Sequence, residues 1–268
     1  MVTLNQIAEL IEERAPLQTQ EDWDNSGWQI RLAGEAANGE IHRILVTLEI
    51  SEDVVSEAVS EGVQLIVCHH PLIFGGLKKV DSNTVIGNMV CQLVQKGISV
   101  YATHTPFDKC EGGNNDYLAK LLGLVEIQPV AGDESGICRM GRLETLQTAW
   151  QIAERFSVRT GQDRRNYRLA GDTVPDKLVK FIGMCTGAGS EFMSLAAAAG
   201  CDLYVTGDVK YHEAQHAREL GLTLLDMGHF GSEQIFTENM AGILREALDG
   251  QVEVLESKVC LNPFTAIE

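Results

Sequence analysis

Long apolar runs are missing from this sequence of 268 residues, and no stretch approaches the roughly 20 residues that a transmembrane helix needs. The N-terminus lacks a basic segment followed by an apolar one, so no signal peptide is predicted. The seven cysteines form no C-x-x-C pair and follow no regular spacing, which argues against a disulfide framework. These absences together predict a reduced, cytoplasmic protein without a membrane partner.

Basic residues are also scarce. Lysine and arginine number 21 against 38 aspartates and glutamates, which gives a formal net charge of −17. Because so acidic a protein does not attract phosphate backbones over most of its surface, we expect it to bind neither nucleic acid nor an anionic membrane. The apolar content of 44% is that of an ordinary globular protein, long enough for two domains or one large one.

The first half of the chain alternates apolar strands with amphipathic helices. Residues 41–50 and 63–67 are predicted strands, and the helix between them, over 52–60, begins after a capping Ser51. Such a βαβ unit has a right-handed crossover. A helix over 84–96 and another strand follow, so the pattern predicts an α/β fold with parallel strands.

The second half repeats this layout. A predicted strand over 178–185 is followed by a helix over 191–199 and a strand over 202–206. The last helix is expected over 233–248, with Ser232 as its cap, before a final strand. This similarity predicts a duplication, although any two α/β units look alike at this level of detail.

We place the domain boundary in the mixed segment after residue 125, which gives a first α/β domain over 1–125 and a second over 126–268. In a duplicated chain, His69 and His70 would correspond to Gly207 and Asp208, and His104 to His229.

Two adjacent histidines directly follow the strand over 63–67, and Pro71 ends that strand. In open α/β sheets, sites are usually built at the carboxyl ends of strands. Because neutral imidazole is the commonest protein ligand for metals such as zinc, His69 and His70 are candidate metal ligands. A packed or solvated histidine pair is the alternative.

The other predicted strand ends carry more imidazoles and carboxylates, namely His104, Asp108, Asp208, His229 and Glu233. Side chains from several strand ends can converge at one edge of a fold, and a carboxylate can bridge two cations about 3.5 to 4 Å apart. Taken singly, Asp108 and Glu233 are better explained as solvated carboxylates, and His104 as a structural histidine. Only their joint placement favours a metal site.

Residues 212–216 match the H-E-x-x-H pattern, in which two histidines one helical turn apart bind zinc and the glutamate acts as base. Here the predicted helix is a short crossover, and no third ligand follows it. The favoured alternative puts His212 at the rim of a cleft near Asp208, and Glu213 and His216 on a solvated face.

The glycine-rich segment Thr186–Ser190 precedes a predicted helix. Backbone N–H groups at a helix N-terminus can hold a phosphate. This segment lacks the lysine of a P-loop, and a tight turn between strand and helix explains Gly187 and Gly189 at least as well.

Five groups of residues, taken in order along the chain, resemble the motifs of the GTP cyclohydrolase I type 2 homologue family, also called the NIF-three-like or YbgI family. They are Trp23-Asp24-Asn25-Ser26-Gly27, the run from His69 to Phe74, His104 to Asp108 with Gly113 to Asp116, Thr206 to Asp208 with Tyr211 and His212, and Gly228 to Glu233. One departure is Trp28, where many members have leucine.

This resemblance implies a three-layer α/β/α fold of two similar domains with exchanged C-terminal strands, assembled as a toroidal homohexamer. It also implies two divalent metal ions, such as zinc, iron or manganese. The family's ligand pattern carries onto His69, His70, Asp108, His229 and Glu233. Three further side chains are expected beside the metals or toward the substrate: His104, Asp208 and His212.

Two hypotheses follow. The leading one is a dinuclear metal-dependent hydrolase that acts on a nucleotide or a related small molecule through a metal-bound hydroxide, with Asp108 and Glu233 as catalytic residues that bridge or share the metals. Opening of the guanine ring of GTP is one candidate reaction. The alternative is a metal-binding toroidal assembly or regulatory protein without turnover.

Overall fold

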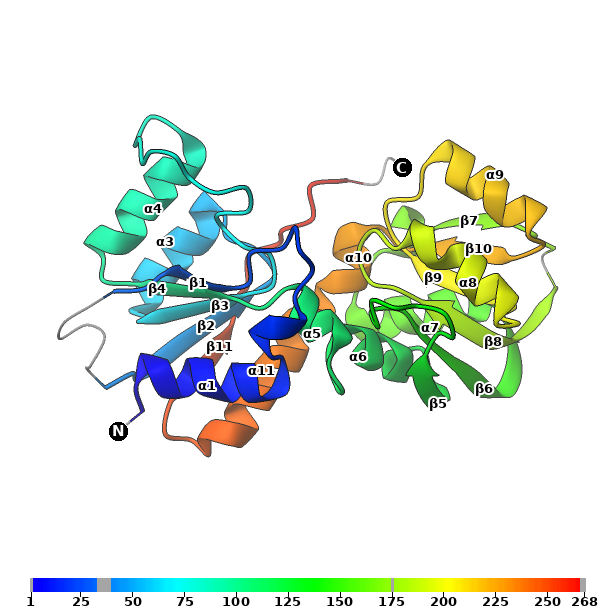
Figure 1. Cartoon of the computed structure of the whole chain (residues 1–268), viewed down its shortest axis with the longest axis horizontal. Helices are drawn as coiled ribbons and strands as arrows, with labels where there is room; N and C mark the ends of the chain where they lie inside the picture. The colour runs from blue at the N-terminus through cyan, green and yellow to red at the C-terminus, as the bar shows by residue number, and fades with distance from the viewer. Residues whose placement is uncertain (1, 33–39, 175, 266–268) are drawn as a thin grey trace. The chain divides into compact units, whose positions relative to one another are not determined.

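The computed structural model describes residues 2–32, 40–174 and 176–265. None of the helices in these ranges is both long and apolar enough to cross a lipid bilayer. The strands fall into two sheets, one in each of two compact units (Figure 1).

The two units divide the chain unevenly. The first unit contains the residues up to Cys110 together with the later segment Phe236–Leu261. The second unit contains Glu111–Ile235. The division along the chain therefore falls at Glu111, whereas the sequence placed it after residue 125. The segment Phe236–Leu261 belongs to the first unit because its strand pairs with the first sheet.

The first unit has a five-stranded sheet in the order β1-β4-β3-β2-β11. The four strands from β4 to β11 run parallel, and β1 runs antiparallel to β4 at one edge. Its strands are β1 (Gly27–Ile30), β2 (Arg43–Thr47), β3 (Leu65–Cys68), β4 (Ser99–Ala102) and β11 (Glu253–Glu256).

Helices cover both faces of this sheet. Figure 1 shows α3 and α4 on one side and α1 and α11 on the other. Thr3, Ser51 and Thr84 cap three of the helices through their side chains, as polar N-cap residues do. The helices are α1 (Leu4–Arg14), α3 (Glu52–Glu61), α4 (Val85–Gln95), the short α5 (Thr105–Lys109) and α11 (Ile235–Leu248), with a 3-10 turn, η1 (Leu17–Thr19).

The second unit has a six-stranded sheet in the order β5-β6-β8-β9-β10-β7. Only β8, β9 and β10 are parallel, and the other neighbours pair antiparallel. The strands are β5 (Leu124–Pro129), β6 (Arg139–Thr148), β7 (Arg168–Gly171), β8 (Leu178–Met184), β9 (Leu203–Thr206) and β10 (Thr223–Asp226).

Two apolar clusters fill the two faces of this second sheet. Residues of α6 and α7 pack with Ile182, Val205 and Leu225, and residues of α8 and α9 pack with Tyr204 and Leu224. The helices are α6 (Asn114–Leu121), α7 (Ala149–Thr160), α8 (Met193–Ala198), α9 (Tyr211–Glu219) and α10 (His229–Glu233), with the 3-10 turns η2 (Arg164–Asn166) and η3 (Ser190–Phe192). The predicted α/β/α class is confirmed.

The two units share one internal order. In each, three adjacent parallel strands are joined by two helices, and an antiparallel strand that comes earlier in the chain lies against the third. These segments are β1 with β2-α3-β3-α4-β4, and β7 with β8-α8-β9-α9-β10. A short helix follows the third strand in both units, α5 in one and α10 in the other. This shared order supports the predicted duplication.

One helix begins later than the sequence suggested. The predicted helix over 233–248 is in fact two, because α10 ends at Glu233 and α11 starts at Ile235. Ser232 is therefore not the cap of the long helix. It is buried inside α10, where its hydroxyl accepts a hydrogen bond from the N–H of Gly187 at 2.9 Å.

Candidate metal centre

Three histidines of the first unit form a compact group. His69 and His70 directly follow β3, and His104 follows the neighbouring parallel strand β4. One ring nitrogen from each lies within 4.8 Å of the others. The N–H groups of His69 and His70 both donate to the carbonyl of Leu48, at 3.0 and 2.9 Å, which fixes where the chain leaves the strand.

The imidazole of His69 is completely buried and has a defined orientation. Its Nδ1 lies 2.9 Å from the carbonyl oxygen of Thr103. Because a carbonyl can only accept, Nδ1 carries a proton, and Nε2 is the nitrogen that remains to bind a metal. Metal-bound histidines are usually oriented in this way by a hydrogen bond at their other ring nitrogen.

A buried carboxylate orients His104. Oδ1 of Asp24 lies 2.9 Å from Nδ1 of His104, and Oδ2 accepts hydrogen bonds from the hydroxyls of Ser26 and Thr105, at 2.9 and 2.6 Å. Burial alone would raise the pKa of the Asp24 carboxyl, but the hydrogen bonds from His104, Thr105 and Ser26 hold that pKa well below its usual range. The ionised carboxylate therefore keeps the Nδ1 proton of His104 in place.

Sequence reasoning did not assign this role to Asp24. Asp24 belongs to the Trp23–Gly27 motif, but nothing local in the sequence indicates that it reaches a histidine 80 positions away. Its place in the Trp23-Asp24-Asn25 motif was the one available signal.

Asp108 brings a carboxylate to the histidine group. It lies on α5, is almost entirely buried, and places Oδ1 3.5 Å from Nε2 of His69. Of the predicted site residues, the first unit thus brings together His69, His70, His104 and Asp108.

A second acidic and imidazole group lies in the second unit. Nδ1 of His229 is 2.8 Å from Oδ2 of Asp208, and its Nε2 is 2.9 Å from Oε2 of Glu233. His229 and Glu233 are four residues apart on α10, so they share one helix face. The Glu233 side chain is buried.

The glycine-rich segment supports Glu233. A Cβ atom at Gly187 would lie only 2.2 Å from Oε1 of Glu233, so only glycine leaves space for that carboxylate. The N–H groups of Thr186, Gly187 and Gly189 donate to side chains of Asn115, Ser232 and Thr206. Since these three donors are engaged within the protein, the segment is better explained as a support for Glu233 than as a phosphate-binding loop.

The H-E-x-x-H residues do not form a zinc site. Oε2 of Glu213 accepts a hydrogen bond from the N–H of Lys210 at 2.7 Å and so caps α9, while Nε2 of His216 lies 2.9 Å from the hydroxyl of Ser194. His212 is exposed, with its ring against Tyr211. Within the described ranges, none of His212, Glu213 and His216 joins a group of three or more side chains able to hold a metal.

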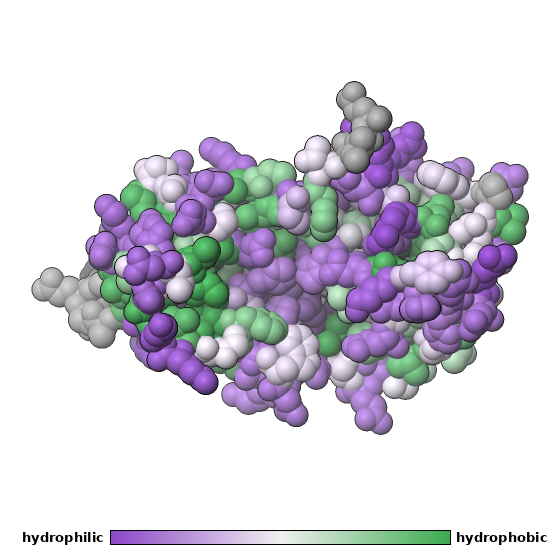
Figure 2. Space-filling model, turned by 90° about the horizontal axis from the view of Figure 1, so that it is seen from above, coloured by the Kyte–Doolittle hydropathy of each residue, from purple (hydrophilic) through white to green (hydrophobic). Residues whose placement is uncertain are grey.

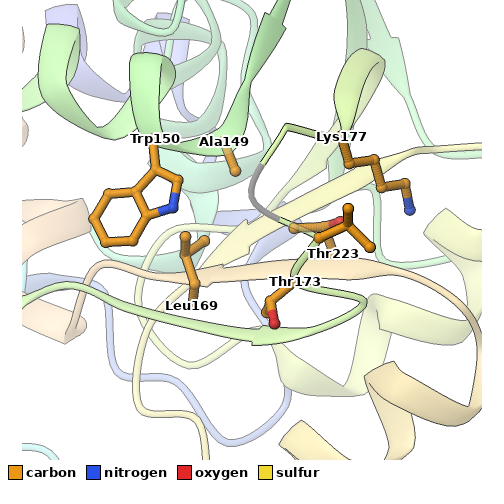
Figure 3. A pocket seen from close by; sticks show the side chains of 7 residues that line it. Ala149, Trp150, Leu169, Thr173, Lys177 and Thr223 are labelled. Carbon is orange, nitrogen blue, oxygen red and sulfur yellow. The ribbon is translucent and has the colours of Figure 1, made fainter.

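Two other features are separate from the candidate ligands. Trp28 lies in β1, where its ring packs edge-on against Tyr101 at 5.0 Å, so it braces the strand pair. A small pocket of the second unit is lined by residues of α7, β7, β10 and the segment after β7 (Figure 3). Its lining includes Trp150 and Lys177 but neither imidazole nor carboxylate, so it offers no alternative metal site.

Comparison with known proteins assigns the chain to a family. Residues 2–263 match the family model described as Duf34/NIF3 (NGG1p interacting factor 3). The chain is 34% identical to a "GTP cyclohydrolase 1 type 2 homolog" of Clostridium perfringens, with 98% of this chain and 99% of that one aligned. A Streptococcus pneumoniae protein of the same name is 33% identical, with 97% and 98% aligned.

A solved structure agrees with this assignment. A hypothetical protein of Staphylococcus aureus superposes with a TM-score of 0.86 at 25% identity, over 99% of each chain. The sequence-based resemblance is confirmed, and the chain belongs to the Duf34/NIF3 family.

Proposed function

We propose that this protein is a dinuclear metal-dependent hydrolase that acts on a nucleotide or a related small molecule. The observation that carries the proposal is the group of three imidazoles in the first unit, in which Thr103 and Asp24 fix the proton positions of His69 and His104. One ring nitrogen of each of these histidines lies within 4.8 Å of the others, close enough for the three to act as ligands of one site. The bacterial relatives are named as cyclohydrolase homologues, which supports the same reaction class.

In this proposal the donor set would hold two divalent ions. His69, His70 and Asp108 would supply ligands from the first unit, and His229 and Glu233 from the second. Neutral imidazoles with carboxylates suit zinc, iron and manganese alike, so the donors define the class of ion rather than its identity. When bound, a pair of such ions lowers the pKa of water and polarises the group under attack.

The chain's own residues have separate tasks in this proposal. Asp108 and Glu233 would bridge or share the ions and offset their charge, and both carboxylates are buried and so kept from bulk water. Asp24 keeps a proton on Nδ1 of His104, and Asp208 would orient the ring of His229 through its Nδ1. His104, Asp208 and His212 would stand beside the metals or toward the substrate.

The test combines metal analysis with turnover. Purified protein loaded with zinc, manganese or iron is assayed against a panel of nucleotides, together with Asp108→Ala, Glu233→Ala and the control His216→Ala. We expect about two metal ions per chain in the wild type and the control, and fewer in the other two variants, with a loss of turnover of roughly a hundredfold or more.

The alternative is a metal-binding assembly or regulatory protein. Full metal loading without turnover of any candidate would favour it, and failure to bind metal would rule out both. Light scattering would test the proposed homohexamer, and cell fractionation the proposed cytoplasmic location.

A further inference from the structure

Two exposed aromatic rings flank the imidazole of His104 in the first unit. The ring centroids of Trp23 and Phe74 are 6.0 Å apart and lie 5.6 and 6.1 Å from the His104 ring. Trp23 is 56% exposed and Phe74 51%. Single exposed aromatic residues are common, but this pair leaves a continuous apolar surface directly beside a candidate metal ligand.

The loops that carry these rings are tied together by polar contacts. The side-chain amide of Asn25 donates to the carbonyl of Ile73 at 2.5 Å, and the N–H of Ile73 donates to Oε1 of Gln29 at 3.0 Å. Both backbone groups of the residue before Phe74 are therefore bonded to the segment that follows Trp23. Because the loops are already ordered, a ligand that stacks on the rings loses little entropy in fixing them.

The spacing of the rings decides how a planar ligand would bind. A third ring inserted between two others needs about 7 Å between their centroids, since stacked carbon atoms lie about 3.5 Å apart. Trp23 and Phe74 are closer than that and tilted by 41°. A planar ligand therefore stacks on the open face of one ring and contacts the edge of the other.

We propose that Trp23 and Phe74 form a platform that binds a planar heteroaromatic ring of the substrate, of the kind found in purines and related heterocycles. The inference rests on the proposed function, because it places the bond that reacts at the neighbouring imidazole group. The protein has a net charge of −17, so charge attraction contributes little to the binding of an anionic nucleotide. Stacking of the ring on Trp23 or Phe74 supplies binding energy that does not depend on charge. Figure 2 shows hydrophobic residues in separate patches on an otherwise hydrophilic face.

The test measures binding of two probes by calorimetry to the full-length, metal-loaded protein. Guanosine carries the planar ring, and ribose 5-phosphate carries a sugar and an anion without it. Trp23→Ala is expected to weaken guanosine binding roughly 5- to 150-fold, as loss of one stacked base does, and Phe74→Ala less strongly. Trp23→Phe should restore most of the affinity.

Trp150 provides a matched control. It is also 56% exposed but lies in the second unit, so Trp150→Ala should leave guanosine binding unchanged. Ribose 5-phosphate should bind the wild type and Trp23→Ala equally, and every variant should keep its full metal content.

Three results would overturn the platform. The first is that Trp23→Ala binds guanosine with the same affinity as the wild type. The second is that the wild type binds none of guanosine, cytidine and a pterin. The third is a change of oligomeric state in Trp23→Ala, which would identify the patch as an interface. Failure of the proposed function gives a different result. A protein that binds guanosine through Trp23 but takes up no divalent ion would support the platform and contradict the proposed hydrolase.

Discussion

The carboxylate of Asp24 lies 2.9 Å from Nδ1 of His104, although the two residues are 80 positions apart in the chain. The same carboxylate accepts a hydrogen bond from the N–H of Thr105 at 3.2 Å, so one buried side chain fixes both the ring and the start of α5. Carboxylates that orient the histidines of a metal site usually contribute to its metal affinity.

We therefore predict that Asp24→Asn lowers metal affinity about 10- to 100-fold while the protein remains folded. The amide that replaces the carboxylate carries no charge and cannot hold the Nδ1 proton as firmly. A chelator competition titration measures the effect. The exposed neighbour Asp22 provides the control, and Asp22→Asn should bind metal as the wild type does. Equal affinity in the two variants would remove Asp24 from the site.

A second prediction concerns the space beside Glu233. Gly187→Ala is expected to destabilise the protein by about 3 kcal/mol, since the new methyl group meets Oε1 of Glu233 and the backbone has a φ of +65°. The variant should also lose metal, because the carboxylate must move. Urea unfolding and metal analysis measure the two effects.

A control at Gly97 separates the cost of the backbone conformation from the cost of the contact with Glu233. Its φ is +73°, but a Cβ there meets nothing within 4 Å. Gly97→Ala should therefore cost only about 1 to 2 kcal/mol and leave metal binding intact. If both alanine variants retained their metal equally, the contact between Gly187 and Glu233 would have no role in the site.

The third prediction separates the metal centre from the H-E-x-x-H pattern. Glu213→Gln should keep the metal content and any turnover of the wild type, because Glu213 caps α9 through the N–H of Lys210. A zinc protease with Glu213 as its base would instead lose peptide cleavage completely in this variant. Metal analysis and a peptidase assay distinguish the two readings.

The fourth prediction concerns stability and pH. The hydroxyl of Tyr101, inside the first unit, donates to Oε1 of Glu12 at 2.7 Å, and Tyr101→Phe should cost about 1 kcal/mol. Burial, followed by the hydrogen bond to Glu12, raises the pKa of Tyr101 above its usual range. The folded state thus keeps a proton that the unfolded chain releases above about pH 10, so this contribution is complete below that pH and declines as the pH rises.

Denaturant titrations at pH 8 and pH 10.5 measure this difference. The difference in unfolding free energy between the wild type and Tyr101→Phe should be smaller at pH 10.5 than at pH 8. Tyr211 is 72% exposed, so Tyr211→Phe should match the wild type at both values. A gap that grew with pH would contradict the assigned cause.

The sequence was sufficient for the parts of the fold that depend on local pattern. The apolar run before His69 and the proline after His70 predicted where β3 ends, and capping residues such as Ser51 marked helix starts. The break between α10 and α11 was missed, because the residues around Ser232 are compatible with one continuous helix and only the burial of its hydroxyl reveals the turn.

The site was predictable in its residue types but not in its contacts. Imidazoles at strand ends are visible in the sequence, because position along a strand is a local property. The tie between Asp24 and His104 and the fit of Gly187 against Glu233 depend on which loops meet after folding. Such contacts arise from tertiary packing, and the spacing of residues along the sequence does not predict them.

The pairing of β11 with β2 has a consequence for biosynthesis. Val254 lies in register with Ile44, so the first sheet gains this edge strand only after residues 111–235 have been synthesised. The second unit, Glu111–Ile235, is contiguous apart from a few terminal residues and can fold while translation continues. Until Glu253–Glu256 has been synthesised, β2 has an unpaired edge, so the first sheet is completed only after the segment of the second unit has emerged.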